Sequence, residues 1–92
     1  MGAFEVRKII VDNLHREQDK KKQIIEEIKE HNEEIIEFKK TRNIVGWFVW
    51  DVQNETFRHE QKILKSSLQL IQTKILTYKD LLEQINNNNT TP

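Results

Sequence analysis

Apolar side chains recur at alternating steps of three and four residues through the second half of the chain. The run comprises Trp47, Trp50, Asn54, Phe57, Gln61, Leu64, Leu68, Ile71, Ile75, Tyr78, Leu82 and Ile85, with Asn54 and Gln61 as its less apolar members. This spacing is the a/d heptad of a helix that buries one side against another helix. The pattern therefore predicts a helix over residues 47–85.

The first half of the chain predicts another amphipathic helix, over residues 4–41. Its heptad positions are Val11, Leu14, Gln18, Lys21, Ile25, Ile28, Asn32 and Ile35, and Ile24, Ile36 and Phe38 widen the apolar side over the second half. Residues 15–23 contain no apolar side chain. Asn43 tolerates the left-handed conformation at a helix end, and Gly46 is the only glycine after position 2, so we expect the turn at residues 42–46.

Together these patterns predict an all-α fold, in which two long helices form an antiparallel helical hairpin, or coiled coil, completed by oligomerisation. With 92 residues, 36% hydrophobic and 33% charged, the chain is large enough for one domain, which we place at residues 1–85. Residues 86–92 are rich in Asn and Thr and are predicted to form a disordered tail.

The stretch from Ile44 to Val52 allows a second interpretation, because it is nearly continuous Ile, Val, Trp and Phe. Such residues favour strands, and a β-hairpin within residues 44–58, between two helices, is the alternative fold. The heptad spacing continues through Trp50 and Phe57, and no Asn-Gly or Asp-Gly pair marks a tight turn, so the helical interpretation is preferred.

In an antiparallel hairpin folded about residue 45, residue i faces approximately residue 90 − i. This register is expected to bring an acidic run in the first helix beside bases of the second. The acidic residues are Glu26, Glu27, Glu30, Glu33, Glu34 and Glu37, and the bases are Arg58, His59, Lys62 and Lys65.

The same register predicts that the polar stretch 15–23 leaves Leu68, Leu70 and Ile71 uncovered, so that a second copy or another protein must bury them. An aromatic cluster at the hairpin tip forms another expected contact. The predicted partner-binding residues are Trp47, Phe48, Trp50, Phe57, Leu64, Leu68, Leu70, Ile71 and Ile75.

The sequence offers little for catalysis or metal binding. It has no cysteine, and its histidines, at positions 15, 31 and 59, are too far apart in sequence to pair on one helix face. His59-Glu60 begins like a zinc-protease motif, but Ile63 stands where the second histidine belongs. We expect no catalytic residues, no cofactor, no metal and no enzymatic activity, and we expect His31 to be a packed or half-exposed side chain and not a metal ligand.

The charge balance predicts a protein without a strong electrostatic field, and the sequence shows no targeting signal. The chain has 15 basic and 15 acidic residues, and its one basic cluster, Arg16 with Lys20–Lys22, lies among acidic neighbours. Glu5 and Arg7 interrupt the N-terminal apolar residues, and no stretch is long enough to span a membrane. The expected location is the cytoplasm.

The hairpin is similar in length to the small helical hairpins of type VII secretion, which carry a Trp and a Gly at the turn. Here the order is Gly46-Trp47 instead of Trp-x-Gly, and Leu82 follows Tyr78 where that class has an acidic residue. The resemblance therefore extends to architecture only.

Three functions follow as hypotheses. The first is a non-enzymatic protein–protein interaction module, a coiled-coil adaptor, assembly or regulatory protein that forms a homo-oligomer such as a dimer, binds a helical protein partner, or does both. The second is a small nucleic-acid-binding regulatory dimer that uses Arg16 and Lys20–Lys22. The third is a secreted or chaperoned helical hairpin that pairs with another protein.

Overall fold

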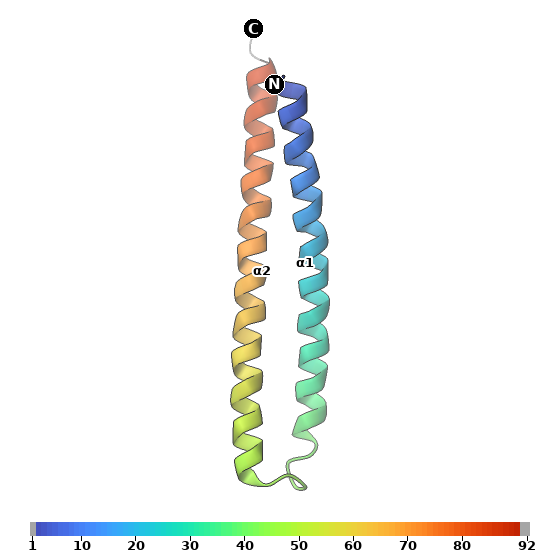
Figure 1. The fold of residues 1–92 in the computed structure, drawn as a ribbon, viewed down its shortest axis with the longest axis vertical. Coiled ribbons are helices and arrows are strands. Elements are labelled where there is room, and N and C mark those ends of the chain that lie inside the picture. Colours follow the sequence, from blue (N-terminus) through green and yellow to red (C-terminus); the bar gives the residue numbers. More distant parts are fainter. Residues whose placement is uncertain (1, 91–92) are drawn as a thin grey trace. The chain divides into compact units, whose positions relative to one another are not determined.

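In a computed structural model, which describes residues 2–90, the chain forms two helices joined by a short turn (Figure 1). Helix α1 spans Ala3–Lys39 and helix α2 spans Trp47–Thr90. The predicted all-α helical hairpin is confirmed. The alternative β-hairpin at residues 44–58 is wrong, because α2 begins at Trp47 and no strand occurs within residues 2–90.

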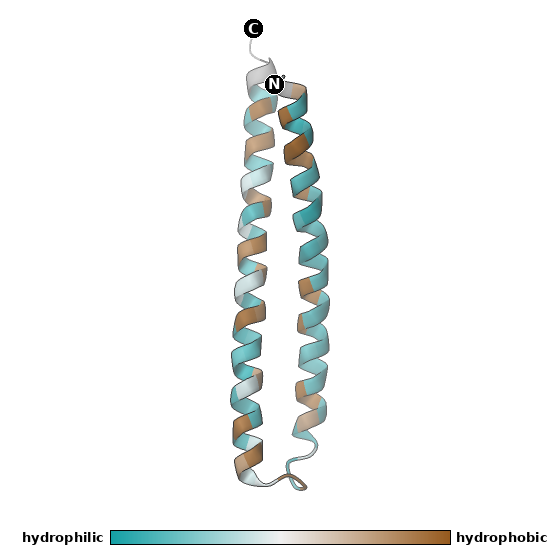
Figure 2. Ribbon diagram, viewed as in Figure 1, coloured by the Kyte–Doolittle hydropathy of each residue, from teal (hydrophilic) through white to brown (hydrophobic). Residues whose placement is uncertain are grey.

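The chain divides into two compact units, and each contains a segment of α1 and a segment of α2. The terminal unit combines Met1–Lys22 with Gln69–Pro92, and the tip unit comprises Gln23–Leu68 with the turn between the helices. In Figure 2, apolar residues alternate with polar ones along both helices, as expected for helices that each bury one side.

Helix α2 buries the side that its heptad spacing predicts. Every predicted position from Trp50 to Ile85 is half-buried or buried. The exception is Trp47, whose side chain is 77% exposed. Trp47 is the first residue of α2, and α1 ends at Lys39, so the residues across from Trp47 belong to the turn and offer no helix to pack against.

Helix α1 buries a side that differs from the predicted one at every second heptad position. The side comprises Ile10, Leu14, Glu17, Lys21, Ile24, Ile28, His31, Ile35 and Phe38, all buried or half-buried at regular steps of three and four. The predicted positions Ile25 and Asn32 are exposed instead. The sequence pattern favoured Ile25 for its apolar character, whereas the structure accepts Glu17 and His31, two polar residues, in the buried row.

The buried hydrophobic core is small and lies in the terminal unit, where it comprises Ile10, Leu14, Ile71 and Ile75. The expectation that α1 cannot cover Ile71 is therefore wrong. Glu17 is buried and Lys21 half-buried in the row that faces α2, and long polar side chains cover apolar surface with their aliphatic stems. Leu68 is half-buried, and of the three residues only Leu70 is exposed as expected.

Local hydrogen bonds close the turn, and it begins earlier than predicted, after Lys39. The Lys40 and Thr41 amides donate to the Glu37 and Phe38 carbonyls, and the Ile44 and Val45 amides donate to the Thr41 carbonyl at 2.9 and 3.0 Å. No residue from 2 to 90 has a positive φ angle. The left-handed role expected for Asn43 is therefore wrong, and α1 instead ends in i→i+3 bonds that satisfy its last carbonyls.

At its other end, α2 continues beyond the predicted last residue, Ile85, to Thr90. Residues 86–90 thus lie within α2, where the sequence predicts a disordered tail, and residues 91–92 lie outside the described part. Asn lowers helix propensity without stopping a helix, and Pro92 is the first residue after Ile85 that is incompatible with a helix interior. Neither helix contains, within its described residues, an apolar stretch long enough to cross a lipid bilayer.

The burial of Ile75 predicts a large difference between neighbouring substitutions. Ile75→Ala is expected to lower the free energy of unfolding by about 2–4 kcal/mol, because it removes buried methyl groups and leaves a cavity. Leu76→Ala, the matched control at an exposed position, is expected to change it by less than about 0.5 kcal/mol. Urea denaturation followed by circular dichroism measures both, and equal effects would contradict the assignment of Ile75 to the core.

Candidate protein-interaction surface

Aromatic side chains hold the two helices together near the turn. Phe38 at the end of α1 stacks on Trp50, with ring centroids 4.9 Å apart and planes 17° apart, and it meets Phe57 edge-on at 5.5 Å. The Arg42 guanidinium lies 5.8 Å from the Trp50 ring centroid, within cation–π distance. Two of the predicted partner-binding aromatics, Trp50 and Phe57, therefore serve packing within the tip unit.

The remaining apolar residues around the start of α2 are exposed. We name them the tip patch, which comprises Ile44, Trp47, Phe48, Val49 and Val52, each between 52% and 86% exposed. The rings of Trp47 and Phe48 contact each other edge-on, with centroids 6.1 Å apart. Five large exposed hydrophobic residues within nine positions are the kind of surface that marks a protein contact, and Trp is the most enriched anchor at such contacts.

A polar layer crosses the tip unit between α1 and α2. His31 Nε2 lies 2.8 Å from Glu60 Oε2, and Gln61 Nε2 donates to Asn32 Oδ1 at 2.7 Å. The buried His31 ring also packs edge-on against Phe57 at 5.4 Å. His31 is thus a packed residue, as expected, and its pairing with Glu60 confirms the predicted register to within one residue.

The charges do not pair across the helices in the way the sequence suggested. Arg58 Nη1 binds Glu55 Oε1 of its own helix at 2.7 Å, and Lys40 Nζ binds Glu37 Oε1 at 2.9 Å. Heptad positions explain the difference, because most acids of the run in α1 lie on one flank of the buried rows, whereas Arg58, Lys62 and Lys65 of α2 lie on the other. The expectation that the register brings Arg58 beside the acidic run is therefore wrong.

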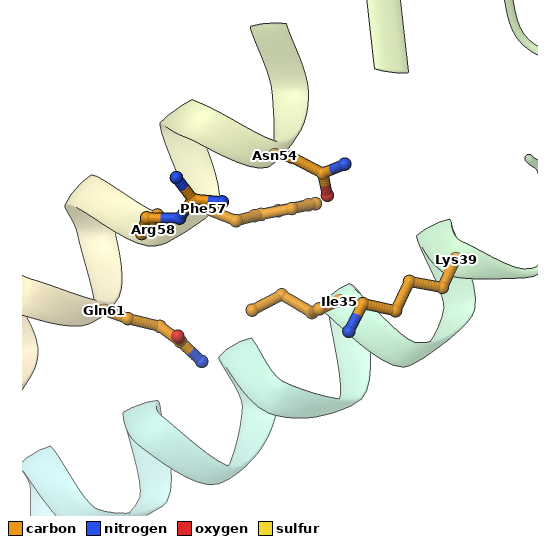
Figure 3. A pocket seen from close by; sticks show the side chains of 6 residues that line it. All are labelled: Ile35, Lys39, Asn54, Phe57, Arg58 and Gln61. Atoms are coloured by element: carbon orange, nitrogen blue, oxygen red, sulfur yellow. The ribbon is translucent and has the colours of Figure 1, made fainter. Parts of the chain in front are cut away.

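An open groove of about 270 Å³ follows the flank of the tip unit that carries the bases. Figure 3 shows Ile35 and Phe57 at its centre, with Lys39, Asn54, Arg58 and Gln61 around them. A second groove, of about 280 Å³, lies in the terminal unit beside Ile75 and the exposed Leu76. Neither groove contains a buried titratable group, and no set of three His, Cys, Asp or Glu residues within the described residues is placed to hold a metal ion.

The predicted partner-binding residues fall into three classes of burial. Trp47, Phe48 and Leu70 are exposed, Trp50, Phe57, Leu64 and Leu68 are half-buried, and Ile71 and Ile75 are buried. Sequence reasoning missed Ile44, Val49, Val52 and Ile63 as exposed apolar residues. The sequence contained a signal for Val49, Val52 and Ile63, because each lies two residues after a position of the predicted heptad, on the outer side of α2.

Comparisons with known proteins place no relative beside these surfaces: no protein family matches the chain, and no similar curated protein or solved structure was found. The fold class, an all-α helical hairpin, therefore comes from the structure itself, and the function has to be argued from the surfaces.

The His31–Glu60 contact predicts a stability difference between two glutamates of α2. Glu60→Ala is expected to destabilise the fold by about 1–3 kcal/mol, because within the described structure it removes the only hydrogen-bond partner of the buried His31 ring, whose Nδ1 already lacks one. Glu55→Ala removes the exposed pair with Arg58 and is expected to cost less than about 1 kcal/mol. Thermal and urea unfolding measure both variants. An unchanged stability in Glu60→Ala would show that the contact contributes nothing.

Proposed function

We propose that the chain is a non-enzymatic protein–protein interaction module, of the coiled-coil adaptor or assembly kind, that binds its partner through the tip patch. The observation that carries the proposal is the exposure of Ile44, Trp47, Phe48, Val49 and Val52 beside aromatic residues that are already packed. Burying one such aliphatic or aromatic side chain contributes roughly 1.5–3 kcal/mol. A partner that covers the patch therefore gains free energy of the same order as the cost of association.

The exposed area supports the same proposal. The chain exposes 7379 Å², whereas an average folded monomer of 11.1 kDa exposes about 5,700 Å². The difference, about 1,700 Å², exceeds the roughly 800 Å² that each partner buries in an interface of standard size. One partner contact of ordinary size is therefore compatible with the area that this chain leaves uncovered.

Nucleic-acid binding has less support from the side-chain contacts. Lys20, within the basic cluster, binds Glu17 of its own helix at 3.2 Å, and Lys21 is half-buried in the row that faces α2. A phosphate contact by Lys20 would compete with this ion pair, which leaves Arg16 and Lys22 as the other exposed bases of the cluster.

The tip patch predicts which substitutions abolish partner binding. The double variant Trp47→Ser/Phe48→Ser is expected to lose the partner that the wild-type chain retains on an affinity matrix in extracts of its source cells, read by quantitative mass spectrometry. Its melting temperature is expected to stay within a few degrees of wild type, because both side chains are exposed.

Ile36→Ser is the matched control, because Ile36 is as exposed as Val49 but lies on α1. It is expected to retain the partner. Loss of the same protein from both variants, or from neither, would contradict the assignment of the contact to the tip patch.

A further inference from the structure

The outer side of α2 in the tip unit carries an uncharged row of residues, which we name the outer row. It comprises Val49, Val52, Thr56, His59, Ile63 and Ser66, all of them exposed. Each lies two residues after a position of the predicted heptad of α2, so the outer row repeats the alternating steps of three and four. Val52 and Ile63 each expose more than half of their area. This spacing is what a third helix needs in order to pack beside α2.

The flank of α1 next to the outer row is acidic. In heptad notation, Ile35 and Phe38 occupy positions a and d, which places Glu27, Glu30 and Glu34 on the c/g flank of α1. Figure 3 fixes the two flanks, because Lys39 and Arg58, both at e positions, line one groove between the helices. The c/g flanks of α1 and α2 therefore lie together on the opposite side of the hairpin. The residues of the outer row nearest to this side are those at c positions of α2, Val49, Thr56 and Ile63.

Within residues 2–90, Glu27, Glu30 and Glu34 form no ion pair, and Glu60, at a g position of α2, adds a further carboxylate on this side. Like charges at i,i+4, such as Glu30 and Glu34, repel each other by a few tenths of a kcal/mol. A partner that presents bases here would relieve this repulsion. The outer row lies beside acidic residues that no base in the described part of the chain neutralises. A partner that covers both surfaces therefore needs apolar side chains for the outer row and basic side chains for the acidic flank.

We propose that the outer row binds an amphipathic helix of another protein, with apolar residues at heptad spacing that pack on Val49, Val52 and Ile63 and with Lys or Arg on the edge that faces Glu27, Glu30 and Glu34. The inference rests on the proposed function and deepens it by naming the chemistry of the partner. A second copy fits less well, because a two-fold antiparallel pairing on the outer row brings two acidic flanks to the same side.

The test uses two synthetic helical peptides of about three heptads, enough to follow the outer row from end to end. Both carry Leu at the heptad positions, and their flanking positions are Lys in one peptide and Glu in the other. Binding of each labelled peptide to the full chain is followed by fluorescence anisotropy at low and at high salt. The Lys peptide is expected to bind at least about tenfold more tightly at low salt, with a preference that shrinks at high salt. Equal binding of the two peptides would overturn the inference.

Substitutions then locate the bound peptide. Ile63→Lys is expected to weaken binding of the Lys peptide about tenfold, whereas Ile36→Lys, an equally exposed control on the other flank of α1, leaves it unchanged. Glu30→Lys/Glu34→Lys is expected to remove the preference for the Lys peptide. Glu5→Lys/Asp12→Lys, with the same change in net charge but in the terminal unit, is expected to keep it. Unchanged binding in Ile63→Lys, with helicity confirmed by circular dichroism, would also overturn the inference.

Two further measurements separate this inference from the proposed function. Trp47→Ser/Phe48→Ser is expected to retain most of the affinity for the Lys peptide. The experiments can therefore contradict binding through the tip patch while they support binding through the outer row, or contradict the outer row while they support the tip patch. Sedimentation of the chain alone identifies the competing occupant. A wild-type dimer that Ile63→Lys converts to a monomer would show that a second copy covers the outer row, and would overturn the inference.

Discussion

The structure depends on the packing of one row of α1 against one row of α2, because residues 2–90 form no other layer that could cover their apolar side chains. The result is a thin core, with four buried hydrophobic residues in the terminal unit. Along the tip unit, the contact instead relies on half-buried aliphatics, the stacked Phe38 and Trp50 rings and the hydrogen bonds of His31 and Gln61. A fold of this kind leaves each helix with an outer side that is free to contact other molecules.

Much of the fold was predictable from α2 alone. Its apolar residues at heptad spacing determine which side is buried, and a helix with one apolar side requires another to pack against. Helix α1 was harder, because Ile24 and Ile25, like Ile35 and Ile36, are adjacent apolar pairs that fit two phases equally well. In the structure, the buried side of α1 is the one that includes Glu17 and His31. Contacts with α2 determine this choice, and the hydrophobic pattern of α1 alone does not contain them.

The candidate interaction surface was predicted only in part, because the exposure of a residue on α2 depends on what α1 places opposite it. Trp47 and Phe48 precede the region where α1 can cover α2, and their exposure follows from the position of the turn. Ile71 was assigned wrongly, because counting apolar residues opposite it ignored the methylene groups of Glu17 and Lys21. The acidic flank was recognised in the sequence, but its separation from Arg58 depends on which way each helix is rotated. The register alone, residue i facing residue 90 − i, does not contain that rotation, so it placed Arg58 beside the acidic run.

The polar layer around His31 also restricts how the helices can align. If α1 slid along α2 by one heptad, the apolar rows would still meet, but His31 would face Gln53 or Ser67 instead of Glu60, and Asn32 would face Asn54 or Leu68 instead of Gln61. A polar residue in an otherwise apolar row is known to select one alignment in this way, at some cost in stability. In a hairpin whose hydrophobic repeat tolerates such a shift, these two pairs disfavour the shift that places Asn32 opposite Leu68, whereas the opposite shift keeps the polar residues Gln53 and Asn54 across from His31 and Asn32.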